Sequence, residues 1–408
     1  MNQQKPNSII ALPVIVAALG YFVDIYDLLM FSIIWKPSLT DLGVSQDRLA
    51  SVGEHIISVQ MYGLLIGGII WGVMGDKKGR LSVLFGSIIL YSVANILNGF
   101  AQNESQYAII RFVAGLGLAG ELGAGITLVS EIIPKEKRGL ATSLVAGLGL
   151  TGAVVAYFIK INFHWRTCYF IGGALGFMLL LLRVSVFESG MFNKVKNSNI
   201  VKGDVSMFFR SKDRFKKYIC AIFIGLPTWY VIGVLLTFAP VYAQNFGIKE
   251  PIDSGKAIMF AYAAISVGDV VAGMISQWMK SRKKAMLLFY GMSSLCIFLF
   301  FATKGGGSAT GLYVLSACLG FATGFWAIFV TMGAEQFGTN LRATAATTVP
   351  NFVRGMLPLM LLLANAFRAK TDYVTGAWIA GVIIMGIAIT ALYFTKETFG
   401  KDLNYVEE

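Results

Sequence analysis

The feature that most constrains this chain is a series of apolar runs of roughly 20 residues, each long enough for a helix to cross a bilayer. Lipid cannot hydrogen-bond a backbone, so runs of this length are expected to be helices. Only 14% of the 408 residues are charged, compared with about 25% in an average soluble domain. The sequence therefore predicts an all-α membrane protein whose surroundings are the lipid bilayer.

Twelve such runs are present, six on each side of one long polar segment. We expect transmembrane helices at about 9–35, 53–74, 81–101, 106–131, 139–160, 166–186, 217–242, 256–279, 285–303, 308–333, 343–366 and 373–395. The polar, basic segment between the sixth and seventh runs reads as a linker. We therefore predict an N-terminal six-helix bundle (1–186), a cytoplasmic linker (187–216) and a C-terminal six-helix bundle with a short tail (217–408).

The net charge of +12 could suggest a nucleic-acid partner. Most of the Lys and Arg residues, however, fall in the loops on one side of the predicted membrane, for example at 77–80, 135–138 and 194–217. This is the positive-inside bias, which places both termini in the cytoplasm. The charge therefore indicates orientation, and no nucleic-acid partner is expected.

Metal, cofactor and enzyme chemistry find no support in the sequence. The four cysteines are scattered, without a CxxC spacing or a neighbouring cluster of histidines. Free cysteine packs as a small hydrophobe, and no nucleophile–base pair is recognisable along the chain. We expect no metal, no cofactor and no enzymatic activity.

The two halves carry signs of an internal repeat. Glu131 is followed seven residues later by Arg138, and Glu335 seven residues later by Arg342, with the two acids 204 residues apart. The same offset superimposes the basic loop after the second run on that after the eighth. Repeats of this kind are typical of transporters that bind a solute near the midplane between the halves.

Several motifs resemble those of the major facilitator superfamily over essentially the whole chain. The residues are Gly75–Arg80 after the second run, Arg111 with the glycines that follow it, and Glu131–Gly139. Within that superfamily, Asp24–Asp27 and Gly120–Ala124 resemble the metabolite:proton symporters. The phagosomal amino-acid transporter group shares the general pattern.

The resemblance implies a monomer in a bacterial inner membrane that works by alternating access. It also implies a set of charged gating residues at the cytoplasmic side: Asp76, Arg80, Glu131, Arg138, Glu335 and Arg342. Asp76 would cap the start of the eleventh helix, where the helix dipole favours an acid.

Acids within the apolar runs are costly and therefore need a reason. Asp24 and Asp27 lie three residues apart, hence on one helix face, where two carboxylates repel and one is favoured to hold a proton. Alternatively, one of them pairs with a cation such as Arg111. Glu121 is a second candidate for proton coupling, or one member of a buried structural pair.

Arg354 is a permanent cation midway along the eleventh run, between Pro350 and Pro358. Its guanidinium suits a carboxylate-bearing solute. The alternative is an ion pair with Asp269 or another acid. The further candidates for solute contact are Asn351, Tyr26, Trp229, Tyr230, Asp269 and Trp326, although aromatic side chains at helical spacing more often serve packing.

These features predict proton-coupled uptake of a small carboxylate-bearing metabolite or amino acid. Facilitated diffusion or export of a metabolite without proton coupling is the alternative. A membrane receptor that senses a nutrient without moving it is a third possibility. Such receptors often add a long soluble tail, whereas this chain ends soon after its last predicted span.

Overall fold

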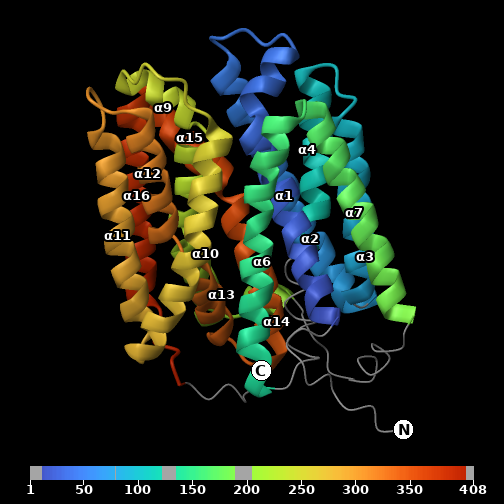
Figure 1. Ribbon diagram of the computed structural model, residues 1–408. Helices are drawn as coiled ribbons and strands as arrows, with labels where there is room; N and C mark the ends of the chain where they lie inside the picture. Colours follow the sequence, from blue (N-terminus) through green and yellow to red (C-terminus); the bar gives the residue numbers. More distant parts are fainter. Residues whose placement is uncertain (1–11, 79, 122–134, 189–204, 401–408) are drawn as a thin grey trace.

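The computed structural model describes residues 12–78, 80–121, 135–188 and 205–400, and these residues form two helical bundles side by side (Figure 1). The first bundle contains α1 (Leu12–Asp41), α2 (Leu49–Lys78), α3 (Arg80–Asn98), α4 (Glu104–Leu118), α6 (Lys135–Asn162) and α7 (Trp165–Glu188). A short 3₁₀ helix, η1 (Val205–Phe208), precedes the second bundle.

The second bundle contains the remaining helices, several of which are segments of one interrupted span. They are α8 (Lys212–Trp229), η2 (Tyr230–Leu236), α9 (Ala239–Phe246), α10 (Ser254–Trp278), α11 (Arg282–Ala302), α12 (Ala309–Ala322), α13 (Trp326–Glu335), α14 (Thr339–Gly355), α15 (Leu357–Arg368) and α16 (Tyr373–Phe394). Joining α8 to η2, α12 to α13 and α14 to α15 gives six spans in this bundle, and α9, with eight residues, is too short to be a further span.

Within the described residues, ten helices are long and apolar enough to cross a membrane, and α3 is a shorter apolar helix. Together with α4, they form the predicted architecture of six spans in each half. The chain is therefore an integral membrane protein with the fold class that the sequence predicts. The linker prediction stays untested, because 189–204 lie outside the described residues, and α8 begins at Lys212 rather than at 217.

The interruptions in the second bundle have local causes. Pro227 lacks an N–H, and the helix continues after Trp229 as a π-helix. Pro358 stands at the start of α15 and ends the regular hydrogen bonding of α14. The backbone of Gly268 on α10 lies against Gly324, where α12 gives way to α13, so that neither position has room for a side chain. Such breaks bring irregular backbone to the middle of the bundle, where it can line a site.

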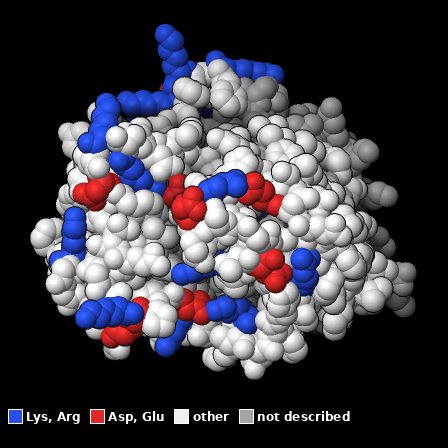
Figure 2. Space-filling model, turned by 90° about the horizontal axis from the view of Figure 1, so that it is seen from above, with Lys and Arg blue, Asp and Glu red and all other residues white. Residues whose placement is uncertain are grey.

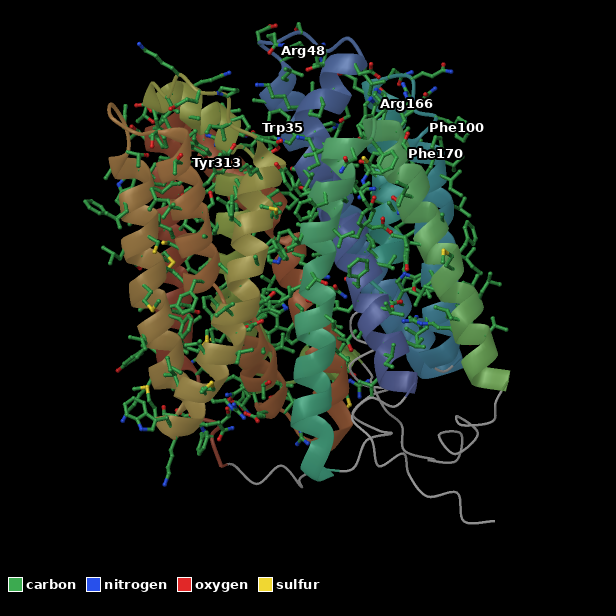
Figure 3. All side chains as sticks on the ribbon, in the orientation of Figure 1. Trp35, Arg48, Phe100, Arg166, Phe170 and Tyr313 are labelled. Atoms are coloured by element: carbon green, nitrogen blue, oxygen red, sulfur yellow. The ribbon has the colours of Figure 1, made fainter. Side chains whose placement is uncertain are left out.

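The end of the molecule that carries the loops 42–48, 99–103, 247–253 and 369–372 is called the outer end here (Figure 1). It is opposite to the end that the positive-inside bias assigns to the cytoplasm. At the outer end the two halves touch. The indole of Trp35, which lies between the bundles (Figure 3), donates a hydrogen bond to the backbone oxygen of Thr237 at 2.8 Å.

Candidate functional site

A buried ion pair joins the two halves near the middle of the spans that carry it. Asp24 is on α1 and Arg354 is on α14, and their Oδ2 and Nη1 atoms are 3.7 Å apart. Their side chains are 0% and 2% exposed. The ion pair predicted for Arg354 as an alternative to solute binding thus exists, but its partner is Asp24 rather than Asp269.

Aromatic side chains from three helices surround this pair. The ring of Trp229 lies 6.0 Å from the guanidinium carbon of Arg354, and the Tyr21 hydroxyl is close enough to interact electrostatically with Arg354. Tyr262 on α10 is close enough to interact electrostatically with Tyr21, Arg354 and Asp24. A cation over the face of an aromatic ring is stabilised by the quadrupole of that ring, and such a face can also stack on a flat solute.

Several polar atoms of the central pair make no hydrogen bond within the described residues. Both carboxylate oxygens of Asp24 and the Nε and Nη1 atoms of Arg354 have no hydrogen-bond partner within the described residues. Asn351, one turn before Arg354, donates to the backbone oxygen of Ala119 at 2.9 Å, while its own side-chain oxygen has no partner there. Unsatisfied buried charged groups cost at least about 1–3 kcal/mol each. The pair can therefore accept a further ligand.

Asp27 faces the interior of the first bundle, beside a different arginine. Arg111 of α4 donates to the backbone oxygen of Asp27 at 3.1 Å, to Gln60 at 3.1 Å and to Asn95 at 3.2 Å. The Asp27 carboxylate packs against Gly172 of α7, where a Cβ would lie 2.5 Å from Oδ1. The two carboxylates of helix one thus lie next to different arginines, Asp24 between the halves and Asp27 within one half.

Glu121 is one member of a buried pair, as the structural alternative for this residue predicts, and its partner is Arg183, which the sequence did not single out. Arg183 of α7 donates to both of its carboxylate oxygens, and the side chains are 2% and 3% exposed. Both lie against Gly20 of α1, where no side chain would fit. Arg183 is near the end of its apolar run, a place where arginines commonly extend to the interface, so the sequence alone does not mark it as buried.

Four of the predicted contact residues have other partners or positions. The Tyr26 hydroxyl donates to the backbone of Cys168 in the first bundle. The Tyr230 hydroxyl donates to the backbone of Ala377 on α16. Asp269 accepts the Ala327 N–H at 3.0 Å and so caps α13, with Trp326 at the start of that helix. Of the predicted set, Arg354, Asn351 and Trp229 come together around the central pair.

The gating residues are placed only in part. Glu131 lies outside the described residues, and the side chains of Asp76, Arg80 and Arg138 are likewise outside them. Glu335 forms a two-pronged pair with Arg282, with both distances 2.7 Å. Arg342 donates to the backbone oxygen of Phe337 at 3.3 Å. The second-half acid thus pairs with the first residue of α11.

Two six-helix halves with a charged site between them define a membrane carrier of small solutes. The sequence model described as Major Facilitator Superfamily matches residues 17–357. The chain belongs to this family. It is therefore a transporter and not an enzyme, and the resemblance found in its motifs is confirmed.

Relatives of this chain span nearly its whole length. The niacin transporter NiaP of Acinetobacter baylyi is 24% identical, with 96% of this chain and 95% of the relative covered. The benzoate transport protein of the same species is 24% identical, with 81% and 78% covered. The gentisate transporter of Corynebacterium glutamicum is 24% identical, with 80% and 75% covered.

Solved structures show the same fold. The crystal structure of a D-xylose-proton symporter matches with a TM-score of 0.70 at 18% identity, and the match covers 97% of this chain and 100% of that one. At this identity, the likeness concerns the arrangement of the helices.

Proposed function

We propose that this protein is a proton-coupled importer of a small aromatic carboxylate, working as a monomer in a bacterial inner membrane with both termini cytoplasmic. The observation that carries the proposal is the central pair: a buried arginine between the two halves that lies beside an aspartate and the ring of Trp229. Two of its donor atoms have no hydrogen-bond partner within the described residues. A guanidinium of this kind matches a carboxylate in shape and charge.

Proton coupling is assigned to Asp24 among the three acids considered. Arg354 can serve Asp24 or the carboxylate of a solute, but a solute has to displace an ionised Asp24 from it. Protonation of Asp24 removes this competition and leaves the guanidinium to the solute. Binding of the proton and binding of the solute therefore favour each other. In this scheme Glu121 is structural because Arg183 already holds it.

The aromatic part of the proposed solute has two supports. The ring of Trp229 lies beside Arg354, and Tyr21 and Tyr262 bring two further aromatic side chains near it. In addition, the names of two similar proteins refer to benzoate and gentisate, which are aromatic carboxylates. An aliphatic amino acid would use Arg354 but would gain little from the rings.

The first experiment is a thermal-shift screen of the purified protein against aromatic carboxylates, aliphatic carboxylates and amino acids. A ligand of the folded state raises stability by RT ln(1 + [L]/Kd), so millimolar binders are visible at high concentration. We expect benzoate-like acids to stabilise the protein and Arg354→Gln to abolish the shift. The matched control, Arg48→Gln, removes an exposed arginine at the outer surface and should leave the shift intact.

The second experiment follows any hit into proteoliposomes with an acidic outside. We expect accumulation that collapses with the pH gradient. Counterflow without accumulation would instead support the alternative function, facilitated diffusion or export of a metabolite. Stabilisation only by amino acids would redirect the proposal to that solute class, and hits that survive Arg354→Gln would refute the assigned site.

A further inference from the structure

A second set of charges connects the halves, far from the central pair. At the outer end of α2, Glu54 pairs with Arg368, the last residue of α15, at 2.5 Å between Oε1 and Nη1. Their side chains are 9% and 8% exposed. Asn365 donates to Glu54 at 2.8 Å, Arg368 donates to the Tyr242 hydroxyl at 3.0 Å, and the ring of Tyr373 lies 3.7 Å below the guanidinium.

A corresponding pair joins another pair of helices across the halves. Lys160, near the outer end of α6, donates to Asp253, which also caps the first turn of α10. This pair is less buried, at 19% and 30% exposed. A cavity of about 770 Å³ adjoins it, lined from both halves and including Lys36. Figure 2, which views the outer end face on, shows acidic and basic side chains interspersed over it.

The two pairs are related by the repeat of the fold. α2 and α10 are the second spans of their halves, while α6 and α14–α15 are the fifth. In each half an acid stands at the outer start of the second span and a base near the outer end of the fifth. Each acid binds the base of the opposite half. A rotation that exchanges the halves therefore exchanges the two ion pairs.

We infer that the Glu54–Arg368 and Lys160–Asp253 pairs form one symmetric clamp that holds the outer end closed. One ion pair joins α2 to α15, and the other joins α6 to α10. The inference rests on the proposed alternating-access cycle, in which the outer end must open to admit solute. Separation of the halves at this end breaks both pairs together, since α2 packs on α15 and α6 on α10. Trp35 and Thr237 bridge the halves by a third contact.

The geometry distinguishes these pairs from other charges at the same end. Arg48–Glu104 and Lys304–Asp372 each lie within one half, so opening leaves them intact. Arg48 lies at the outermost tip (Figure 3). Only the pairs that cross between halves can bias the open and closed states, because a contact that is the same in both states shifts nothing.

The test measures the distance between the halves at the outer end, without solute or proton gradient. Spin labels are placed at Thr40 on α1 and Gln244 on α9, both exposed, after replacement of Cys220, Cys296 and Cys318 by alanine. Distances are measured by pulsed electron paramagnetic resonance in lipid nanodiscs. Because this readout needs no transport, a failure of the clamp is distinguishable from a failure of the proposed function.

Each variant removes both charges of a pair, so that no buried charge is left alone: Glu54→Gln with Arg368→Gln, and Lys160→Gln with Asp253→Asn. We expect the ratio of the longer to the shorter distance population to rise in each, and by roughly two- to thirty-fold when the two double variants are combined. The charge-swapped variant Glu54→Arg with Arg368→Glu should restore the shorter distance.

The matched control is Arg48→Gln with Glu104→Gln, which deletes an outer pair within one half and should leave the distribution unchanged. Distances that stay the same in both clamp variants would overturn the inference. An equal shift in the control would overturn it as well, since the effect would then come from outer surface charge in general. If one clamp variant fails to fold, the distance measured in the other clamp variant decides between the two outcomes.

Discussion

At the scale of single residues, the acids inside the membrane separate by their partners. Asp24 faces Arg354 across the interface between the halves, Asp27 lies beside Arg111 inside one half, and Glu121 is bound by Arg183. In the proposed alternating-access cycle, only the first pair would change its surroundings as the halves move. We therefore propose Asp24, the acid at the interface between the halves, as the residue that couples the proton to transport.

Asp24→Asn tests that assignment. The amide cannot ionise, so Arg354 is always available to the solute, and solute binding should lose its dependence on pH. In the unmodified protein, the affinity should fall as the pH rises and Asp24 becomes charged. Isothermal titration between pH 5.5 and 8.5 measures both profiles. A variant that keeps the pH dependence of the unmodified protein would transfer the coupling role to Asp27 or Glu121.

Glu121→Gln, in contrast to Asp24→Asn, should lower the stability of the folded protein rather than change the pH dependence of solute binding. It leaves the guanidinium of Arg183 buried without its carboxylate, at a cost of about 3–5 kcal/mol in the free energy of unfolding. Replacing both residues, Glu121→Gln with Arg183→Met, removes the buried charge and should recover most of this loss. Unfolding in mixed micelles measures both variants. Unchanged stability of Glu121→Gln, with loss of proton-driven accumulation, would contradict the structural role.

Buried charged residues could be recognised from the sequence where a charged side chain interrupts an apolar run. Arg354, Asp24 and Glu121 stand out in this way, and the first two do meet. Arg183, Glu54 and Arg368 do not stand out because they lie near the ends of their spans, where charges usually reach water. Tyr26 and Tyr230 could not be placed, since a sequence does not fix which side of a helix faces the interface between halves.

At the scale of elements, one cap joins the last helix to α11. Glu397, just after α16, accepts from the Ser281 hydroxyl and from the backbone N–H groups of Arg282 at 3.0 Å and Lys283 at 3.2 Å. Partial burial alone would raise the pKa of Glu397. These hydrogen bonds, with one from the Phe399 N–H, outweigh burial and lower the pKa to about 2. The positive end of the α11 dipole favours the same charge.

Glu397→Gln should therefore lower stability at neutral pH by roughly 1 kcal/mol, after discounting for its exposure. A carboxyl whose pKa is depressed on folding stabilises the protein above its unfolded pKa, and this contribution is lost as the pH falls toward the folded value. The difference between variant and parent should thus be full at pH 7 and shrink between about pH 4.5 and 2. Thermal unfolding across this range measures it; a difference independent of pH would rule out the charged cap.

Elements as such were readily predicted, because an apolar run of 20 residues has few alternatives in lipid. The interruptions were not. The π-helix after Trp229 and the break between α12 and α13 depend on how neighbouring helices pack, as at Gly268 and Gly324. Pro227 and Pro358 indicate that the helices are interrupted near these positions. They do not indicate whether the interruption is a π-helix or a break between two helices.

At the scale of the whole molecule, the repeat in the sequence corresponds to the symmetry of the charges at the outer end. Of the motif pairs that first indicated the repeat, the second lies at the other end, where Glu335 binds Arg282. Glu131 of the first pair lies outside the described residues. Sequence offsets locate equivalent positions within each half. They do not show which residues meet across the interface, because that depends on the relative placement of the halves.

The proposed coupling also implies how the carrier responds to the electrical potential. In that cycle the empty site holds Arg354 and an ionised Asp24, whose charges cancel. Loaded with a proton on Asp24 and a monocarboxylate on Arg354, it is again neutral. Because neither form moves net charge across the membrane, the transmembrane voltage cannot drive uptake of the solute. The voltage acts strongly only on charge that is not balanced within the site.

In proteoliposomes with a potassium diffusion potential and no pH difference, we therefore expect no accumulation of the solute. A pH difference of one unit at zero voltage should support about tenfold accumulation. Voltage-driven uptake would show that a second proton moves with each solute. An electroneutral carrier of this kind gathers its solute from acidic surroundings, and it merely equilibrates the solute wherever the pH is equal on both sides, however strongly the membrane is energised.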